Sequence, residues 1–298
     1  MIAFYFFSVI IFDMEKEQVI KNNLGSSAFI ERQLLGGMMN GSYVVDNLVK
    51  EYILYMPTAQ ANEMVERKEE KRHLDIVYPL GITSKNVYFD VEKGIKINEF
   101  INGDSLNNLS DYDEEKVAII LRKLHESGLR SNLDYLPFER FVGFEKEALE
   151  FSPLDDTYRL LKEIIFSNKD YLLSDPLVLS HNDFQKSNIV LNSETNAYYM
   201  IDFEFMANNC EIYDIACFAN NDVRDGERLL KAYFKNPSAD EYRKFYLWRI
   251  FISLQWYLVA IIKHYRKEGE KHHIDFLAVA NHFINIALIS KDKLAKLS

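Results

Sequence analysis

The sequence predicts an α+β protein with two lobes: a small N-terminal lobe with an antiparallel sheet and one helix, and a larger, mainly helical C-terminal lobe. Before residue 100, short apolar runs alternate with turn residues, which is typical of strands. Beyond residue 104, apolar residues recur at helical spacing. The residues at 101–104 resemble a hinge, so we expect lobes over residues 1–100 and 101–298.

Composition narrows the class of protein. The chain has 298 residues, of which 48% are hydrophobic, so it can bury a sizeable core. Its formal net charge is −10 and no basic face stands out, which argues against nucleic acid as a partner. Cys210 and Cys217 are the two cysteines, too few for a disulfide framework and wrongly spaced for zinc. We therefore expect a reduced, cytoplasmic setting.

The first twelve residues are almost wholly apolar, but they lack the basic region and the cleavage site of a signal peptide. They are also too short to span a bilayer. We expect a first strand or helix packed on the core, or an extension over residues 1–13 with Met14 as an alternative start. No other stretch is interpreted as a membrane span.

A helix-like run over 14–23 precedes the sheet of the N-terminal lobe. Strands are predicted over 29–35, 43–45, 51–56, 77–80, 87–90 and 94–100, and the one helix of the lobe over 62–73. The glycine-containing turn at 36–41 has a shape that can fold over phosphates, because glycine lets backbone N–H groups approach an anion. An ordinary hairpin turn is the alternative interpretation of the same residues.

Helices dominate the C-terminal lobe. They are predicted over 114–127, 158–165, 213–219, 225–234, 240–264 and 274–293. Asp111 or Asp113 can cap the first of them.

One stretch inside this lobe, residues 179–204, breaks the helical pattern. Two short strand-like runs flank a polar turn, which predicts a hairpin with Asn188 and Asp202 at the same edge. Asp183 comes in the loop just before it. Two carboxylates and an amide oxygen are hard ligands, and such a set suits a magnesium ion beside a reacting phosphate.

The same stretch carries a family resemblance. His181-Asn182-Asp183, followed by Asn188 and later by Asp202-Phe203-Glu204, resembles the aminoglycoside phosphotransferase and choline kinase superfamily, bacterial choline kinases in particular. Similar motifs occur at 36–40, 94–101 and 213–216. The resemblance covers about residues 30–265. It implies a protein-kinase-like fold, a nucleotide-binding N-terminal lobe, ATP as phosphoryl donor and Mg²⁺ as cofactor.

The resemblance also implies roles for individual residues. Asp183 would be the catalytic base, and Asn188 and Asp202 would be magnesium ligands. Glu204 would be a second acidic group near the metal or the substrate. Asp214 would tie the catalytic loop by hydrogen bonds.

Nucleotide binding is assigned to the N-terminal lobe. The residues that the resemblance implies for it are Gly37, Asn40, Glu70, Glu99 and Ile101. The sequence departs from the family pattern at Tyr55, where a lysine or arginine should pair with the helix glutamate and the phosphates. Lys50 is out of register with that position, so we expect Glu70 to lack its cation.

Choline is the favoured acceptor. Tyr213, Trp256 and Tyr257, with Phe205, can form aromatic walls around a quaternary ammonium, although Val259 stands where a second tryptophan is usual. Core packing is the alternative for Trp256 and Tyr257. An aminoglycoside or other small-molecule kinase, or a weakened pseudokinase-like nucleotide-binding module, remain as alternative functions. We expect a monomer or homodimer with no membrane partner.

Overall fold

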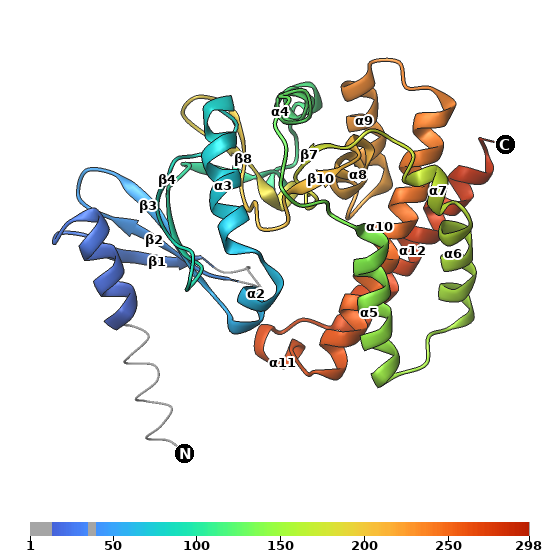
Figure 1. Cartoon of the computed structure of the whole chain (residues 1–298), viewed down its shortest axis with the longest axis horizontal. Helices are drawn as coiled ribbons and strands as arrows, with labels where there is room; N and C mark the ends of the chain where they lie inside the picture. Colours follow the sequence, from blue (N-terminus) through green and yellow to red (C-terminus); the bar gives the residue numbers. More distant parts are fainter. Residues whose placement is uncertain (1–13, 35–39, 298) are drawn as a thin grey trace. The chain divides into compact units, whose positions relative to one another are not determined.

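A computed structural model describes residues 14–34 and 40–297. The chain divides into two compact units (Figure 1). The N-terminal unit comprises residues up to 104 together with 190–204, and the C-terminal unit comprises 105–189 and 205–298. The sequence predicts one C-terminal lobe over residues 101–298, but residues 190–204 belong to the N-terminal unit. The apolar start at 1–13 and Gly37 lie outside the described residues.

A five-stranded antiparallel sheet is the framework of the N-terminal unit. Its strands follow the order β1 (Phe29–Leu34), β2 (Asn40–Asp46), β3 (Glu51–Pro57), β5 (Ile95–Glu99) and β4 (Asn86–Asp90). A helix over residues 14–24 brings Ile20 into a buried cluster with Val45, Leu54 and Ile97. The apolar positions that predicted β2, β3 and β5 therefore line the core of this unit.

Two predictions in the N-terminal unit are wrong. The single helix expected over 62–73 is divided into α2 (Ala59–Met64) and α3 (Arg67–Val77), because Val65 and Glu66 adopt extended backbone conformations. The strand expected over 77–80 is instead the end of α3 followed by the 3₁₀ turn η1 (Tyr78–Leu80). Pro79 lies in the first turn of η1, where its missing N–H costs nothing, whereas a strand ladder would need that donor.

The predicted hairpin over the polar stretch is confirmed. It consists of β8 (Ile189–Asn192) and β9 (Tyr198–Met200), and β6 (Gly103–Ser105) adds a third strand beside β8. A Cβ atom at Gly103 would lie 2.0 Å from the carbonyl oxygen of Leu191, so only glycine permits this approach. The hairpin also joins the rest of its unit through the amide of Met200, which donates to the carbonyl of Ile82 at 2.7 Å.

The C-terminal unit is mainly helical. Its helices are α4 (Glu114–His125), α5 (Pro137–Phe151), α6 (Asp156–Ser167), α7 (Lys169–Leu172), α8 (Glu211–Phe218), α9 (Val223–Phe234), α10 (Ala239–Tyr265), α11 (Gly269–His272) and α12 (Phe276–Ala295). The 3₁₀ turns η2 (Leu106–Asn108) and η3 (Lys186–Asn188) and the paired strands β7 (Val178–Ser180) and β10 (Ala207–Asn209) complete it. The six predicted helices are present as α4, α6, α8, α9, α10 and α12, whereas α5 and the short helices α7 and α11 were not predicted.

The long helix α10 organises this unit, because α5, α6, α8 and α12 all pack against it. By length and composition α10 could cross a membrane, although no stretch after the first twelve residues was expected to do so. However, 83% of its most apolar 18-residue segment is buried inside the protein. Core packing therefore accounts for its hydrophobicity. Asp113, and not Asp111, caps α4 by accepting from the amides of Glu115 and Lys116.

Candidate active site

The loop that carries the predicted base begins where β7 ends, in the C-terminal unit. Asn182 adopts a positive φ of 64°, a conformation that asparagine tolerates better than most residues. Its side-chain amide donates to the carbonyl of Phe205 at 3.0 Å, and its side-chain oxygen accepts from Asn209 at 2.8 Å. The turn is thus tied to Asn209 of the neighbouring strand β10 and to Phe205, two residues before that strand.

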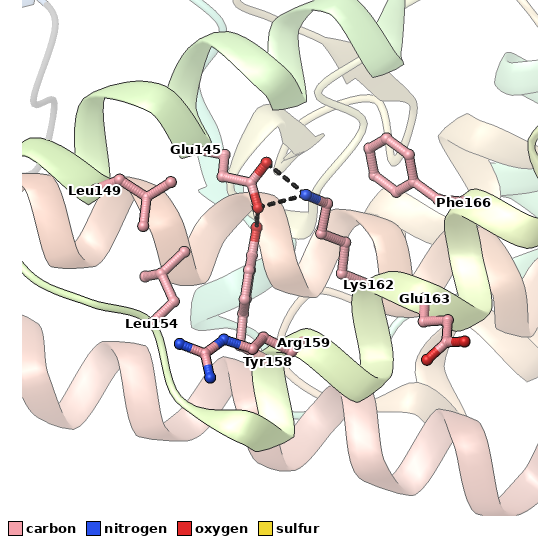
Figure 2. A pocket seen from close by; sticks show the side chains of 8 residues that line it. All are labelled: Glu145, Leu149, Leu154, Tyr158, Arg159, Lys162, Glu163 and Phe166. Carbon is pink, nitrogen blue, oxygen red and sulfur yellow. Dashed lines mark hydrogen bonds and ion pairs between the residues drawn. The ribbon is translucent and has the colours of Figure 1, made fainter.

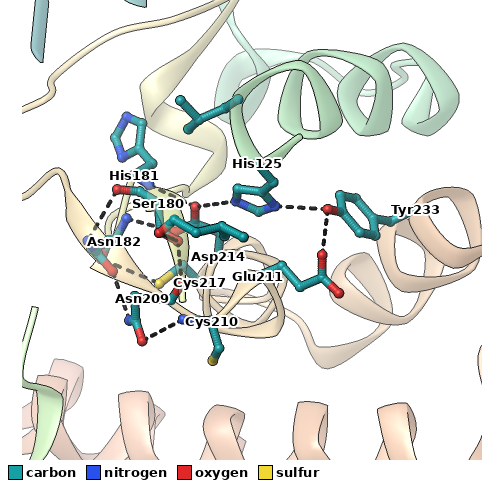
Figure 3. A network of polar contacts seen from close by, with 12 residues as sticks. His125, Ser180, His181, Asn182, Asn209, Cys210, Glu211, Asp214, Cys217 and Tyr233 are labelled. Atoms are coloured by element: carbon teal, nitrogen blue, oxygen red, sulfur yellow. Dashed lines mark hydrogen bonds and ion pairs between the residues drawn. The ribbon is translucent and has the colours of Figure 1, made fainter. Parts of the chain in front are cut away.

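Asp214 of α8 anchors this loop, as the sequence predicts (Figure 3). The Asp214 side chain is fully buried. Its two carboxylate oxygens accept from the backbone amides of His181 at 2.8 Å and Asn182 at 2.7 Å. Hydrogen bonds to a carboxylate are about twice as strong as those between neutral groups, so Asp214 fixes the backbone of His181 and Asn182. Because Asp183 follows Asn182 directly, Asp214 also determines where Asp183 is placed.

A second layer of polar groups supports Asp214. The Nε2 atom of His125 lies 3.0 Å from its carboxylate, and Nδ1 of the same ring lies 3.0 Å from the hydroxyl oxygen of Tyr233. That hydroxyl donates to Glu211 at 2.9 Å (Figure 3). The network joins α4, α8 and α9, and the sequence did not reveal it because its members lie far apart in the chain.

Asp183 is held by amide groups from its own loop. The side chain of Gln185 donates to Oδ1 of Asp183 at 2.7 Å, and the side chain of Asn188 donates to Oδ2 at 2.9 Å. Because the nitrogen of Asn188 faces Asp183, the side-chain oxygen of Asn188 is turned elsewhere, and among the described residues it has only a long contact of 3.5 Å to the Ser187 hydroxyl. The predicted base and the predicted metal ligand therefore constrain each other within one loop.

The N-terminal unit contains a buried cluster of charges. Glu70 of α3 is 1% exposed, and one of its carboxylate oxygens accepts from Arg67 at 2.6 Å. The other oxygen accepts from the ammonium of Lys96 on β5. The expectation that Glu70 lacks a cation is therefore wrong: a neighbouring strand supplies it, a relation that strand register determines. Lys50 instead pairs with Glu99, with 2.6 Å between Nζ and Oε1.

Electrostatics in this cluster follow from burial and pairing. Burial alone would raise the pKa of Glu70, but the charges and hydrogen bonds of Lys96 and Arg67 outweigh it and hold that pKa below its ordinary value. Burial would lower the pKa of Lys96, but the acidic neighbours, Glu70 foremost, hold it above its ordinary value. Both groups of the pair are therefore charged at neutral pH.

Glu204 and Asp202 complete the cluster. Glu204 accepts from Arg67 at 3.3 Å and from the side chain of Asn40, and it lies 3.9 Å from Nζ of Lys96. Burial and the charge of Glu204 raise the pKa of Asp202 above its usual range. The predicted site residues Asn40, Glu70 and Glu204 thus share one cluster in the N-terminal unit.

Two buried atoms of this cluster have no hydrogen-bond partner within the described residues. They are Oδ1 of Asp202 and Nη2 of Arg67. An unpaired buried polar atom costs about 1–3 kcal/mol, so native proteins rarely keep one without a purpose. One atom is an acceptor suited to a cation, and the other is a donor suited to an anion.

The segment around Glu99 and Ile101, predicted to bind the nucleotide, already uses two of its backbone amides within the protein. The amide of Glu99 donates to the carbonyl of Lys85 at 2.8 Å, and the amide of Phe100 donates to Glu51 at 3.2 Å. The Glu99 carboxylate is paired with Lys50. Ile101 therefore remains the better candidate of the two predicted residues in this segment.

The three aromatic residues predicted for the acceptor pack in different places in the C-terminal unit. Tyr213 is buried, with its ring centroid 5.0 Å from that of Trp248. Tyr257 stacks on Tyr158 at 5.5 Å, and Trp256 stacks on Phe283 at 6.0 Å. Adjacent residues on a helix point in different directions, so Trp256 and Tyr257 take separate neighbours.

A different group of aromatic side chains holds a cation. The guanidinium carbon of Arg140, on α5, lies 5.0 Å from the ring centroid of Tyr135 and 5.1 Å from that of Phe205. Tyr135 also contacts Tyr213, with 5.3 Å between ring centroids. Phe205 was named from the sequence, but Tyr135 and Arg140 were missed because no motif marks them.

A surface groove lies between α5 and α6 (Figure 2). Glu145 dominates its polar side: it accepts from the Tyr158 hydroxyl at 2.9 Å and from Lys162 at 2.7 Å. These groups satisfy one another, and none of the lining residues belongs to the loop of the predicted base Asp183. The groove therefore receives no role in the candidate site. Over the described residues, no group of three or more His, Cys, Asp and Glu side chains is placed to hold a metal ion.

Known proteins resemble this chain in both sequence and structure. A family model described as choline/ethanolamine kinase matches residues 31–235. Probable choline kinase 1 of Arabidopsis thaliana is 31% identical over 167 residues, which cover 50% of this chain and 47% of that protein. The chain spans about half the length, or less, of the curated relatives it matches first.

Solved structures extend the likeness to nearly the whole chain. Choline kinase LicA from Streptococcus pneumoniae has a TM-score of 0.71 and 26% identity, covering 95% of this chain and 99% of its own. Wild-type aminoglycoside 2'-phosphotransferase-IIIa has a TM-score of 0.64 at 14% identity, covering 94% of this chain and 98% of its own, which shows a shared fold. The predicted fold class, with its protein-kinase-like relatives, is confirmed. Since the family model spans more than half of the sequence, this chain belongs to the choline/ethanolamine kinase family.

Proposed function

We propose that this protein is an ATP- and Mg²⁺-dependent phosphotransferase that phosphorylates the hydroxyl of choline. The arrangement of Asp183 carries the proposal. Its carboxylate is held from both sides by Gln185 and Asn188, and the loop behind it is anchored by Asp214. A carboxylate fixed in this way suits the task of orienting one hydroxyl group.

In the proposed reaction the alcohol oxygen attacks the γ-phosphorus of ATP. The new O–P bond forms as the bond between the γ-phosphorus and the β-bridging oxygen breaks. Asp183 accepts the proton of the hydroxyl and later releases it to water. The products are ADP, a phosphate ester and one proton.

Magnesium suits the donor atoms that the chain provides. Oδ1 of Asp202 is a buried carboxylate oxygen without a partner among the described residues, and the oxygen of Asn188 has only its long contact to Ser187. Both are hard oxygen ligands of the kind that magnesium prefers. When bound, the ion would neutralise charge on the β- and γ-phosphates. We expect chelation with EDTA to abolish turnover and added Mg²⁺ to restore it.

The choice of choline rests on aromatic side chains. Tyr135 and Phe205 already hold the guanidinium of Arg140, so these rings can hold a cation. The LicA structure, named as a choline kinase, supports the same choice, whereas the family includes both choline and ethanolamine kinases. Ethanolamine is the alternative acceptor, since its smaller ammonium needs fewer aromatic walls.

A turnover assay tests the proposal. ATP and Mg²⁺ are supplied with choline, ethanolamine or an aminoglycoside, and ADP release is measured. We expect choline to be phosphorylated with the highest kcat/KM, and Asp183→Ala to lower kcat by about 10²- to 10⁴-fold. Asp156→Ala, at an exposed surface pair with Arg159, is the control and should leave kcat unchanged. Absence of transfer to any acceptor, with Asp183→Ala behaving like wild type, contradicts the proposal.

The alternative of a nucleotide-binding module without turnover rested partly on Tyr55. Since Lys96 pairs with Glu70, the lack of a cation at Tyr55 is a weaker argument for this alternative. The cytoplasmic location and the monomeric or homodimeric state stay predictions.

A further inference from the structure

Tyr55 stands where the family pattern places a phosphate-binding cation. A tyrosine cannot neutralise phosphate charge, and burial raises the pKa of Tyr55 well above its ordinary value, so it stays protonated. Either the site works without such a cation or another residue supplies it. The inference that follows rests on the proposed function, because it concerns the same nucleotide.

Strand pairing places Lys96 beside Tyr55. The two residues are direct partners across β3 and β5. Side chains of directly opposed residues project from the same face of a sheet. The ammonium of Lys96 accordingly lies 4.8 Å from the centroid of the Tyr55 ring. Lys96 thus projects from the face of the sheet on which a lysine at position 55 would lie.

The partners of Lys96 are those expected of such a cation. Lys96 is 3% exposed and donates to Glu70, the helix glutamate. Oε1 of Glu204 lies 3.9 Å from Nζ of Lys96, and Glu204 follows Asp202 by two residues in the chain. A simple ion pair does not account for this arrangement, because Arg67 already donates to Glu70 at 2.6 Å.

The cluster also has unused capacity for an anion. An ammonium carries three donors, and Glu70 is the one hydrogen-bond partner that the described residues give it. Nη2 of Arg67, a residue that is 5% exposed, is buried in the same cluster and has no hydrogen-bond partner among the described residues. Two cationic groups with free N–H donors, beside a carboxylate oxygen free for a metal, suit a metal-bound phosphate.

We propose that Lys96, assisted by Arg67, is the phosphate-contacting cation of this enzyme and acts from β5 in place of the residue at Tyr55 on β3. Glu70 orients Lys96, as a helix glutamate orients a strand lysine in other kinases. The ring of Tyr55 serves as a flat apolar support that keeps the ammonium in place.

A second-site swap tests this assignment. Binding of Mg·ATP to the full chain is measured by calorimetry, and kcat and KM are measured with choline. We expect Lys96→Met to weaken Mg·ATP binding about tenfold or more and to raise KM for ATP while KM for choline changes little. The double variant Tyr55→Lys/Lys96→Met should recover most of the affinity. Lys93→Met, at an exposed lysine paired with Glu15, is the matched control and should bind Mg·ATP like wild type.

Removal of Lys96 leaves a buried carboxylate with one cation fewer, so the single variant can lose its fold. Glu70→Gln/Lys96→Met removes both charges of the pair and keeps the test valid. It should melt near the wild-type temperature and still bind Mg·ATP weakly. Folded Lys96 variants that bind Mg·ATP like wild type overturn the proposal. If no alcohol is phosphorylated but Lys96→Met still loses nucleotide binding, the proposed function fails and the role of Lys96 stands.

Discussion

Replacing Asp214 by asparagine tests whether the catalytic loop depends on its anchor. The wild-type carboxylate accepts from the amides of His181 and Asn182 through different oxygens, and Oδ2 also faces Nε2 of His125. Asparagine has one acceptor oxygen, so its NH₂ group must face one of these backbone donors. The volume of the side chain is almost unchanged, so packing is preserved.

The magnitude follows from the contacts. One buried backbone amide loses its acceptor, which costs about 1–3 kcal/mol. The bond that remains loses its charge assistance, which costs about a further 1 kcal/mol. We expect Asp214→Asn to lower the free energy of unfolding by about 2–4 kcal/mol. A loop displaced by about 1 Å also predicts a fall in kcat of about 10²-fold.

Urea unfolding followed by tryptophan fluorescence is a suitable assay. Trp248 and Trp256 are the two tryptophans of the chain, and both lie on α10, so the signal reports the unit that contains the loop. Asp156→Asn, at an exposed carboxylate, should leave the midpoint unchanged. If Asp214→Asn unfolds at the wild-type midpoint and retains kcat, the carboxylate does not anchor the loop and the reasoning is refuted.

Three further variants test separate parts of the structure. Gln185→Leu removes the 2.7 Å hydrogen bond to Asp183, so kcat should fall about five- to tenfold with KM for choline unchanged; a change in KM alone contradicts this. Burial lowers the pKa of His73 from 6.5 to about 4, so the unfolded chain takes up this proton first and about 3 kcal/mol of stability is lost as pH falls from 6.5 to 4. His73→Phe should remove that part of the pH dependence measured by urea unfolding, and an unchanged acid slope argues against it. Arg140→Met frees the rings of Tyr135 and Phe205 and should lower KM for choline about threefold or more, whereas a rise in KM shows that Arg140 assists binding.

Much of the fold could be predicted from local patterns. The helices α4, α6, α8, α9, α10 and α12 and the hairpin β8–β9 follow from periodicity and turn residues. The failures have local causes as well. The predicted strand at 77–80 overlooked Pro79, and the predicted helix at 62–73 overlooked the extended conformation of Val65 and Glu66.

The residues of the candidate site also fall into two groups: those that the sequence could name and those that only the structure shows. Asp183 and Asn188 lie five positions apart, so one loop conformation relates them and the sequence could name both. The aromatic residues were harder, because a ring on a helix gives no sign of which neighbour it faces. Trp256 and Tyr257 are adjacent in the chain and yet contact different aromatic rings, whereas Tyr135 and Arg140 carry no motif at all.

The sequence by itself indicated the family and predicted the type of chemistry that we propose, because the spacing from His181 to Asn188 is a short-range property of the chain. Only the tertiary structure decided which cation pairs with Glu70. Tyr55 and Lys96 are far apart in sequence, and the register between β3 and β5 makes them neighbours. Register depends on the whole sheet and its buried face, so no local pattern could show that a lysine on another strand pairs with the glutamate.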